Sequence, residues 1–183
     1  MTQPNTRDRL VQTAARLFRK RGYHGVGMAE ILAEAQAPKG SLYHHFPSGK
    51  SDLALAAADW ASEGMLQIID DAFANAPDYP HGLTTLCYKL AKFYDLNQGW
   101  DGCPVSNTLF EGPENAAFQA RMAEIFEGWI GRVADHGARL GWDQDAAIAR
   151  AQTFLMLIQG AWIMARAHGS SDVIRQVPKH LFP

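Results

Sequence analysis

Residues 28–46 read MAEILAEAQAPKGSLYHHF, and this stretch decides the fold that the sequence predicts. Its first part spaces apolar residues for a short helix over 28–35. Pro38 suits the first position of a second helix, over 38–44, because the amide hydrogen that proline lacks would be unpaired there anyway. Gln36 and Ala37 form the turn between them. Two short helices joined by so tight a turn predict a helix-turn-helix.

The second of these helices has one apolar face and one face that suits contact with another molecule. Successive residues turn by about 100° around a helix, which places Leu42 and Phe46 on one side. The opposite side carries Gly40, Ser41, Tyr43 and His44. Glycine permits close approach of a second backbone, and short polar side chains suit phosphate oxygens and base edges. A solvated three-helix cap without a ligand is the alternative explanation of the same spacing.

Residues 35–46 resemble the DNA-binding signature of TetR/AcrR-type transcriptional regulators. The resemblance is carried by the run KGSLYHHF at 39–46, with Gly-Tyr at 22–23 before it and Lys50, Asp52 and Leu53 after it. The expected helix count and the chain length are similar to those of the family over the whole chain. The segment GCPVSNTL at 102–109 also resembles the LmrA/YxaF-like branch.

The resemblance implies roles on DNA for particular residues. It implies phosphate or base contacts for Tyr43 and His44, and a place along the DNA for the small and cationic residues around them. Gly27 stands where the family usually has a Ser or Thr that caps a helix and touches a phosphate, and glycine lacks that hydroxyl. Gln36 stands where the turn usually has glycine, so a left-handed or distorted backbone is expected there. The predicted DNA-binding set is Gly27, Lys39, Gly40, Ser41, Tyr43, His44 and Lys50.

The charge distribution supports two functional parts. The chain has 183 residues, 47% hydrophobic and 20% charged, with a net charge of −2 that by itself argues against a nucleic-acid binder. Residues 1–50, however, hold eight basic and three acidic residues, a net of +5, whereas residues 51–183 hold nine basic and 16 acidic residues, a net of −7. The sequence therefore predicts a DNA-binding domain over 1–50 and a helical effector-binding and dimerisation domain over 51–183.

Helical spacing recurs along the rest of the chain, and strand-like alternation is weak. A first helix is expected over 6–21, capped by Asn5 or Thr6 and ended by Gly22. Further helices are expected from a cap at Ser48 to about residue 73, over 83–97 and 104–110, from about 118 to near Gly141, and over 143–168 and 172–181. The prediction is an all-α fold of about nine helices, with a three-helix N-terminal domain.

The helix expected over 143–168 is apolar nearly all round, which predicts burial on two faces. In a chain of this size one of those faces is expected to meet a second subunit, and the family resemblance also implies a four-helix dimer interface. The predicted interface is the stripe Ala147, Ala151, Phe154, Ile158 and Ala161. A central core helix of a monomer is the alternative.

Bulky side chains are frequent in residues 51–183, as they are around most small-molecule pockets. The predicted lining residues are Phe93, Phe110, Trp129 and Trp162, although each one singly also fits an ordinary core. The resemblance implies an effector, small and apolar or aromatic, whose binding weakens DNA binding.

Sequence motifs for other classes of function are absent. The chain has no GxSxG, P-loop, GxGxxG or HExxH motif, and its two cysteines have no metal-binding spacing. We therefore expect no enzyme activity, cofactor or metal. The polar start of the chain predicts no signal peptide. The most apolar stretch, residues 153–167, is too short to span a bilayer, and the two cysteines are expected to be reduced thiols of a cytoplasmic protein.

The overall prediction is a DNA-binding transcriptional regulator, a repressor that binds a palindromic operator as a homodimer and is released by a small molecule. The alternative is a helical enzyme or protein-interaction adaptor whose site lies in residues 51–183.

Overall fold

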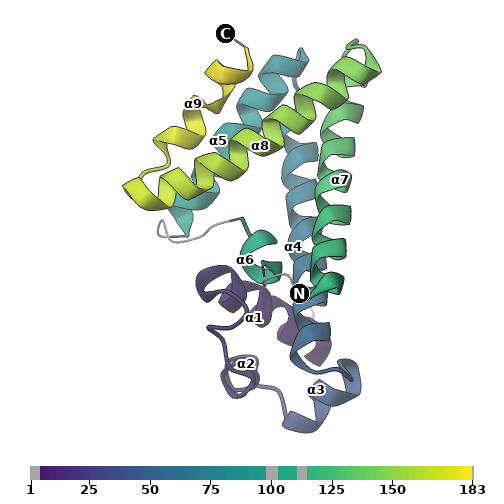
Figure 1. Ribbon diagram of the computed structural model, residues 1–183, viewed down its shortest axis with the longest axis vertical. Coiled ribbons are helices and arrows are strands. Elements are labelled where there is room, and N and C mark those ends of the chain that lie inside the picture. The colour runs from purple at the N-terminus through teal and green to yellow at the C-terminus, as the bar shows by residue number, and fades with distance from the viewer. Residues whose placement is uncertain (1–4, 98–102, 111–114, 183) are drawn as a thin grey trace. The chain divides into compact units, whose positions relative to one another are not determined.

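The computed structural model describes residues 5–97, 103–110 and 115–182, which form nine helices and no strand (Figure 1). The helices are α1 (Thr6–Arg21), α2 (Met28–Glu34), α3 (Lys39–His45), α4 (Lys50–Phe73), α5 (Tyr79–Leu96), α6 (Ser106–Leu109), α7 (Ala116–Arg139), α8 (Gln144–His168) and α9 (Asp172–Leu181). The predicted all-α class is confirmed, with a helix-turn-helix near the N-terminus.

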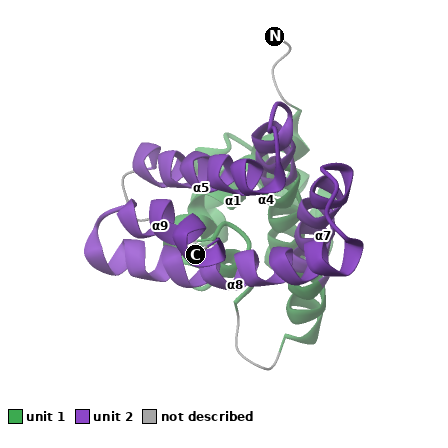
Figure 2. Cartoon of the chain, turned by 90° about the horizontal axis from the view of Figure 1, so that it is seen from above, with its two compact units in different colours: residues 1–63, 103–123 green, residues 64–102, 124–183 purple. Residues whose placement is uncertain are grey.

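The chain divides into two compact units, neither of which is continuous in sequence (Figure 2). Unit 1 comprises residues Met1–Glu63 and Cys103–Ala123, and unit 2 comprises Gly64–Gly102 and Glu124–Pro183. The long helices α4 and α7 therefore each contribute one end to unit 1 and the other end to unit 2. The domain boundary expected after residue 50 does not coincide with the division into compact units. As a boundary between a DNA-binding part and an effector-binding part, it stays a prediction.

Helix α1 forms much of the core of unit 1. It begins after Asn5, whose side chain accepts a hydrogen bond of 2.9 Å from the amide of Asp8. It ends at Gly22, with φ 72°, and basic residues in its last turn suit the negative end of the helix. Its buried side is Leu10, Val11, Ala14, Ala15, Leu17 and Phe18. The helix expected over 6–21 is confirmed.

Three helix starts differ from the expected ones. Pro38 precedes α3 as its cap instead of forming its first residue. At the start of α4, Ser48 acts through its backbone amide, which donates to Asp52 Oδ2 over 2.7 Å. Helix α5 begins at Tyr79, four residues earlier than expected, because Asp78 caps it. Proline and glycine over 77–82 suggested a loop, but proline is well tolerated in a first helical turn.

In unit 2, helix α8 is held by two buried tyrosines of α5. The hydroxyl of Tyr79 donates to the carbonyl of Ala147 over 3.3 Å, and that of Tyr94 donates to the carbonyl of Ala165 over 2.8 Å. Burial raises the pKa of both hydroxyls. Helix α9 packs against both α5 and α8. The alanine side of α8 therefore faces its own subunit.

This arrangement corrects the expected dimer interface. The stripe expected to meet a second subunit is at most 5% exposed within one chain: Ala147, Ala151, Phe154, Ile158 and Ala161. These side chains belong to the core of unit 2 and are unavailable to a partner. A helix that is apolar all round does not reveal from its sequence which face packs inside the subunit.

Candidate nucleic-acid interface and ligand cavity

The turn between α2 and α3 is a tight, left-handed one. Gln36 has φ 50°, the one positive value among the described residues that are not glycine. Its amide donates to the carbonyl of Ala33, and the amide of Ala37 donates to that of Leu32 over 3.0 Å. The left-handed backbone expected at this position is confirmed.

Arg9 of α1 fixes this turn from outside. Its Nε donates to the carbonyl of Ala35 over 3.1 Å, and its Nη2 lies 3.5 Å from the carbonyl of Gln36. These carbonyls lie at the end of α2, where a cation is favoured. Sequence reasoning missed this role, because nothing in the sequence distinguishes Arg9 from the other basic residues of the first fifty.

The outer face of α3 is open to solvent. Leu42 and Phe46 are 1% and 3% exposed and anchor the helix, whereas Tyr43 is 54% exposed. Lys39, Gly40 and His44 are also exposed, and Ser41 is half-buried. A Cβ added at Gly40 would meet nothing within 4 Å, so another molecule can approach the backbone closely there. The structure thus brings these five predicted residues together on one short helix.

Tyr43 stands at the end of this face beside the tight turn into α4. Gly49 has φ 69°, and a Cβ built there would lie 3.6 Å from Tyr43 Cε1. The ring is therefore bordered on one side by the turn. Because more than half of Tyr43 is exposed, it can reach a ligand without rearrangement of the fold.

Gly27 and Lys50 lie away from the outer face of α3. Gly27 caps α2 in an extended conformation without a side-chain hydrogen bond, and it is exposed. Lys50 is half-buried, with its Nζ 4.3 Å from the ring centroid of Tyr23 and 6.0 Å from that of Phe18. Lys50 thus contributes to the packing of unit 1 through its cation–π contacts.

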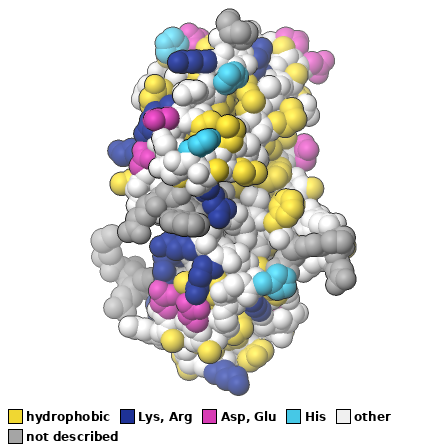
Figure 3. Space-filling view, turned by 60° about the vertical axis from the view of Figure 1, so that its left-hand side comes forward, with side chains coloured by type: hydrophobic (Ala, Val, Ile, Leu, Met, Phe, Trp, Pro, Cys, Tyr) yellow, Lys and Arg dark blue, Asp and Glu magenta, His cyan; other side chains and the backbone are white. Residues whose placement is uncertain are grey.

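Two of the eight basic residues of 1–50 form ion pairs inside unit 1. Arg16 pairs with Glu34 over 2.6 Å, and Arg21 pairs with Glu30, so both pairs join α1 to α2. Figure 3 shows Lys and Arg side chains next to acidic ones on one face of the molecule. Pairs this exposed stabilise a fold by at most about 1 kcal/mol each. Each pair removes one charge of each sign, so the pairing leaves the net charge of +5 unchanged.

Helix α6 belongs to unit 1 and packs on the end of α1. Asn107 Nδ2 donates to the backbone carbonyl of Arg19 over 2.8 Å. This carbonyl belongs to the last turn of α1, where the backbone carbonyls have no amide of the same helix to bind. The segment around Cys103 that resembles the LmrA/YxaF-like branch thus supports the helix behind the helix-turn-helix.

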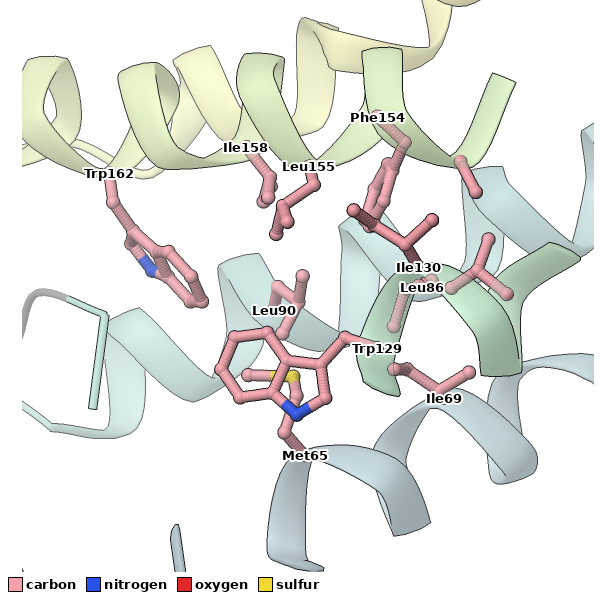
Figure 4. Close-up of a pocket in the computed structure, with 12 residues that line it drawn as sticks. Met65, Ile69, Leu86, Leu90, Trp129, Ile130, Phe154, Leu155, Ile158 and Trp162 are labelled. Atoms are coloured by element: carbon pink, nitrogen blue, oxygen red, sulfur yellow. The ribbon is translucent and has the colours of Figure 1, made fainter. Parts of the chain in front are cut away.

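Unit 2 contains an apolar cavity of about 20 Å³ between α4, α5, α7 and α8 (Figure 4). Its lining is Met65, Ile69, Leu86, Leu90, Trp129, Ile130, Val133, Ala151, Phe154, Leu155, Ile158 and Trp162. Two of the four expected aromatic residues, Trp129 and Trp162, therefore border it.

The other two expected lining residues do not border this cavity. Phe110 is 79% exposed and belongs to unit 1, and Phe93 is half-buried on α5 but absent from the lining. On α5 the lining positions are Leu86 and Leu90. Phe93 follows Leu86 by seven residues and shares its side of the helix, so the helical period alone does not account for its absence from the lining. Aromatic content alone did not reveal which side chains converge.

Reactive thiols, metal sites and membrane-spanning helices are further features that the described part of the chain could contain. Both cysteines are buried, and burial raises the pKa of the Cys87 thiol to about 12. Within residues 5–97, 103–110 and 115–182 no group of three or more His, Cys, Asp or Glu side chains could hold a metal ion. No helix in these ranges is long and apolar enough to cross a membrane.

Comparison with family models gives two matches. Residues 10–57 match the model described as bacterial regulatory proteins, tetR family. Residues 81–180 match the model described as transcriptional regulator LmrA/YxaF-like, C-terminal domain. The first match contains α2, α3 and the turn between them, and the second contains most of unit 2.

Individual proteins agree with the models. The HTH-type transcriptional regulator LmrA of Bacillus subtilis is 26% identical over 90% of this chain and 88% of its own. An uncharacterized HTH-type transcriptional regulator of Mycobacterium tuberculosis is 30% identical over 87% of this chain and 84% of its own.

Solved structures show the same fold. A TetR regulatory protein from Rhodobacter sphaeroides superposes with a TM-score of 0.82, 25% identity and 95% coverage of both chains. A CifR cysteine mutant, crystallised with a 26-base-pair operator DNA, superposes with a TM-score of 0.81 at 19% identity. The superposition covers 99% of this chain and 97% of the CifR chain. This chain, a DNA-binding transcriptional regulator, belongs to the TetR family, with a C-terminal domain of the LmrA/YxaF-like type.

Proposed function

We propose that this regulator is a repressor that binds a palindromic operator as a homodimer and leaves it when a small apolar ligand occupies unit 2. The observation that carries the DNA-binding part is the outer face of α3. Its polar and glycine residues are exposed together, while Leu42 and Phe46 anchor the opposite side. Such a helix can enter a major groove with polar and small side chains, not large apolar ones, facing the base edges.

On DNA, each subunit would place α3 in a major groove, with the two copies about 34–36 Å apart along the duplex. Lys39, Tyr43 and His44 would contact phosphates and hold the helix in register. Gly40 and Ser41 would lie nearest the bases. We propose Lys50 and Gly27 as secondary DNA contacts outside the α3 surface. CifR, which has the same fold, was crystallised with a 26-base-pair operator DNA, and this supports DNA binding by the present chain.

The homodimer would use the exposed side of α8. Met156, Ile163 and Met164 are 68%, 71% and 50% exposed and recur at intervals of seven and eight residues. Gly160 lies between them on the same side, and a Cβ there would meet nothing within 4 Å. Grouped apolar side chains in water mark an interaction surface. The proposed interface is therefore the side of α8 opposite the alanine stripe.

The ligand would act through α4. This helix contributes Met65 and Ile69 to the cavity, and its other end begins at Lys50, directly after α3 and the turn. A ligand that displaces Met65 and Ile69 therefore displaces a helix continuous with the DNA-binding segment. Such coupling requires the ligand to bind the DNA-released form more tightly than the DNA-bound form.

A catalytic role is not proposed. The relatives found by comparison are transcriptional regulators. We propose that the protein acts in the cytoplasm, where bacterial DNA lies.

The test is fluorescence anisotropy with a duplex from the region upstream of the protein's own gene. Lys39→Ala and Tyr43→Ala should each weaken binding by about tenfold or more, since one lost contact is worth about 1–3 kcal/mol. Lys39→Ala should also lower the slope of log K against log salt by about 0.9, because one phosphate contact is lost. Unchanged affinity in both variants would refute the assignment.

Lys92→Ala is the matched control. Lys92 is exposed on α5 in unit 2, so its removal changes the net charge as Lys39→Ala does, without touching α3. Its affinity and salt slope should equal those of the unmodified protein. A loss equal to that of Lys39→Ala would show that net charge, not the α3 surface, determines binding.

A further inference from the structure

We propose that His136 is a proton-sensitive switch between α4 and α7: its neutral imidazole binds both Asp70 and Arg139, and protonation releases Arg139 while it strengthens the bond to Asp70. All three residues belong to unit 2. The inference goes beyond the proposed function and does not depend on it.

The two ring nitrogens of His136 have different partners. Nε2 lies 2.9 Å from Asp70 Oδ1, and Nδ1 lies 2.9 Å from Arg139 Nη2. A guanidinium can only donate, so Nδ1 accepts the hydrogen bond from Arg139 and carries no hydrogen itself. The hydrogen of the neutral imidazole is therefore on Nε2, where it is donated to the Asp70 carboxylate. The neutral ring thus satisfies both contacts.

Protonation changes these two contacts in opposite directions. The added hydrogen goes to Nδ1, which then faces the guanidinium of Arg139 as a second donor. Two cations lie where a hydrogen bond was, and Arg139 must move away. At Nε2 the partners become opposite charges, so the bond between His136 and Asp70 becomes stronger.

The other charged groups of the cleft keep their charge while His136 changes its own. Histidine ordinarily changes charge between about pH 5 and pH 8. Burial alone would raise the pKa of the Asp70 carboxyl, but hydrogen bonds from His136 and Arg132 outweigh it and hold that pKa below 3.8. Asp70 is therefore a carboxylate throughout this range, and both arginines stay protonated. Asp135 is the remaining carboxylate on the lining of the cleft.

The imidazole is held in place, whereas Arg139 is free to move. The ring stacks on Phe73 with 4.5 Å between centroids, and the His136 side chain is 13% exposed. Tyr79 of α5 lies next to Phe73, and burial raises the pKa of its hydroxyl, so it stays uncharged. Arg139 is exposed and borders an open cleft of about 590 Å³. Its guanidinium can therefore turn into water while the imidazole keeps its position.

The switch acts beside the wall of the unit 2 cavity. Ile69 and Val133 line that cavity, and they are the chain neighbours of Asp70 and Arg132. Because Asp70 belongs to α4 and His136 to α7, a stronger bond between them holds the two helices together at this point. A falling pH should therefore tighten α4 against α7 next to the cavity.

The first measurement is the position of the ring hydrogen, by NMR of the full-length ¹⁵N-labelled protein. The signals absent from His136→Gln identify His136. A ring nitrogen without hydrogen resonates downfield, so at about pH 8 Nδ1 should lie downfield of Nε2, and the two should converge towards about pH 5. His81 is the control in the same spectrum. Its Nδ1 lies 2.8 Å from Asp78 Oδ1, so it should carry its hydrogen on Nδ1 more often than His136 does.

The second measurement is the coupling of His136 to each partner, by double-mutant cycles in urea unfolding. His136→Phe keeps a ring against Phe73, and it is combined with Arg139→Ala and, separately, with Asp70→Ala. At about pH 8 the coupling to Arg139 should change the unfolding equilibrium constant by about two- to tenfold, as one hydrogen bond does. At about pH 5 that coupling should vanish or change sign, whereas the coupling to Asp70 should increase.

His136→Gln is the matched control for the titration. Its amide offers one donor and one acceptor, as the neutral imidazole does, but it does not change charge with pH. In this variant the coupling to Arg139 should be the same at both pH values.

Three results would overturn the inference. The first is a hydrogen on Nδ1 of His136 at about pH 8, and the second is the absence of any titration of His136 between about pH 8 and pH 5. The third is a coupling between His136 and Arg139 that is equal at both pH values. The NMR results come from the unmodified protein, so they decide the proposal even if a variant does not fold.

Discussion

Arg9 Nε donates to the backbone carbonyl of Ala35 across 26 residues of sequence, and this bond of 3.1 Å ties the start of α1 to the end of α2. The bond uses the Arg9 guanidinium to hold the end of α2 and the turn that follows it. Stability and DNA binding should therefore depend on Arg9 although it lies outside the predicted DNA-binding set.

Replacing Arg9 with alanine should lower the free energy of unfolding by about 1–2 kcal/mol, because a hydrogen bond to a charged donor is lost. DNA affinity should fall as well, since the turn that sets α3 is released. Urea unfolding followed by circular dichroism gives the first quantity. Lys20→Ala, an exposed cation of the same helix, should change stability by no more than about 0.5 kcal/mol. Equal losses in the two variants would contradict the role of Arg9.

Gln36→Gly should stabilise the protein. A left-handed backbone costs a non-glycine residue about 1–2 kcal/mol, and the greater freedom of glycine in the unfolded chain offsets part of that gain. A net increase of about 0.5–1 kcal/mol is expected. Ala33→Gly, at an exposed position inside α2, should instead destabilise by about 1 kcal/mol. Thermal melts of the two variants should move in opposite directions, and a decrease in Tm for Gln36→Gly would disprove the expected relief of strain.

The proposed dimer face can be tested by charge. Met156→Glu combined with Ile163→Glu should give a monomer near 20.2 kDa by light scattering, whereas the unmodified protein should give twice that mass. The reason is that two carboxylates per subunit would face their copies across an apolar interface. Tyr88→Glu places a charge at an equally exposed aromatic residue of α5 and should remain dimeric. A monomeric unmodified protein would exclude the homodimer.

Acid stability should depend on Asp95. Hydrogen bonds from Ser171 and Arg175 lower the pKa of the Asp95 carboxyl below its ordinary value of 3.8, and Arg175 Nη2 lies 2.6 Å away. A carboxyl whose pKa is lower in the folded state stabilises the fold above its unfolded pKa and loses that contribution as the pH falls.

Asp95→Asn should therefore flatten the decline of Tm between about pH 5 and pH 2. Arg175→Gln breaks the same ion pair from the other side and should flatten it similarly. The double variant should add little to either one, because both changes remove the same interaction. A decline as steep as that of the unmodified protein in both single variants would contradict this account.

Several elements of the fold were predictable from local sequence. The helix over 6–21 has its cap, its apolar stripe and its glycine end within one short segment, and the structure matches it. The left-handed turn at Gln36 was expected from its position in the motif, and it is present. The roles on DNA of the residues of α3 stay predictions, although periodicity placed their side chains on the exposed face.

Other features depend on which surfaces meet in three dimensions. Helix α8 carries apolar residues on every side, and its sequence did not show that the alanine stripe packs inward while Met156 and Ile163 stay exposed. Aromatic content suggested Phe93 and Phe110 beside the cavity, but the lining instead includes aliphatic residues of α4 and α5.

The sequence by itself determined the helices, the turn and the outward face of α3, because each depends on residues within a few positions of one another. Only the tertiary structure decided that Arg9 holds the turn, that Lys50 packs on Tyr23, and that Trp162 has a buried N–H without a partner. The physical reason is that hydrogen bonds and cavities are formed between helices far apart in the chain. Periodicity orients each helix relative to water, but not relative to its neighbours.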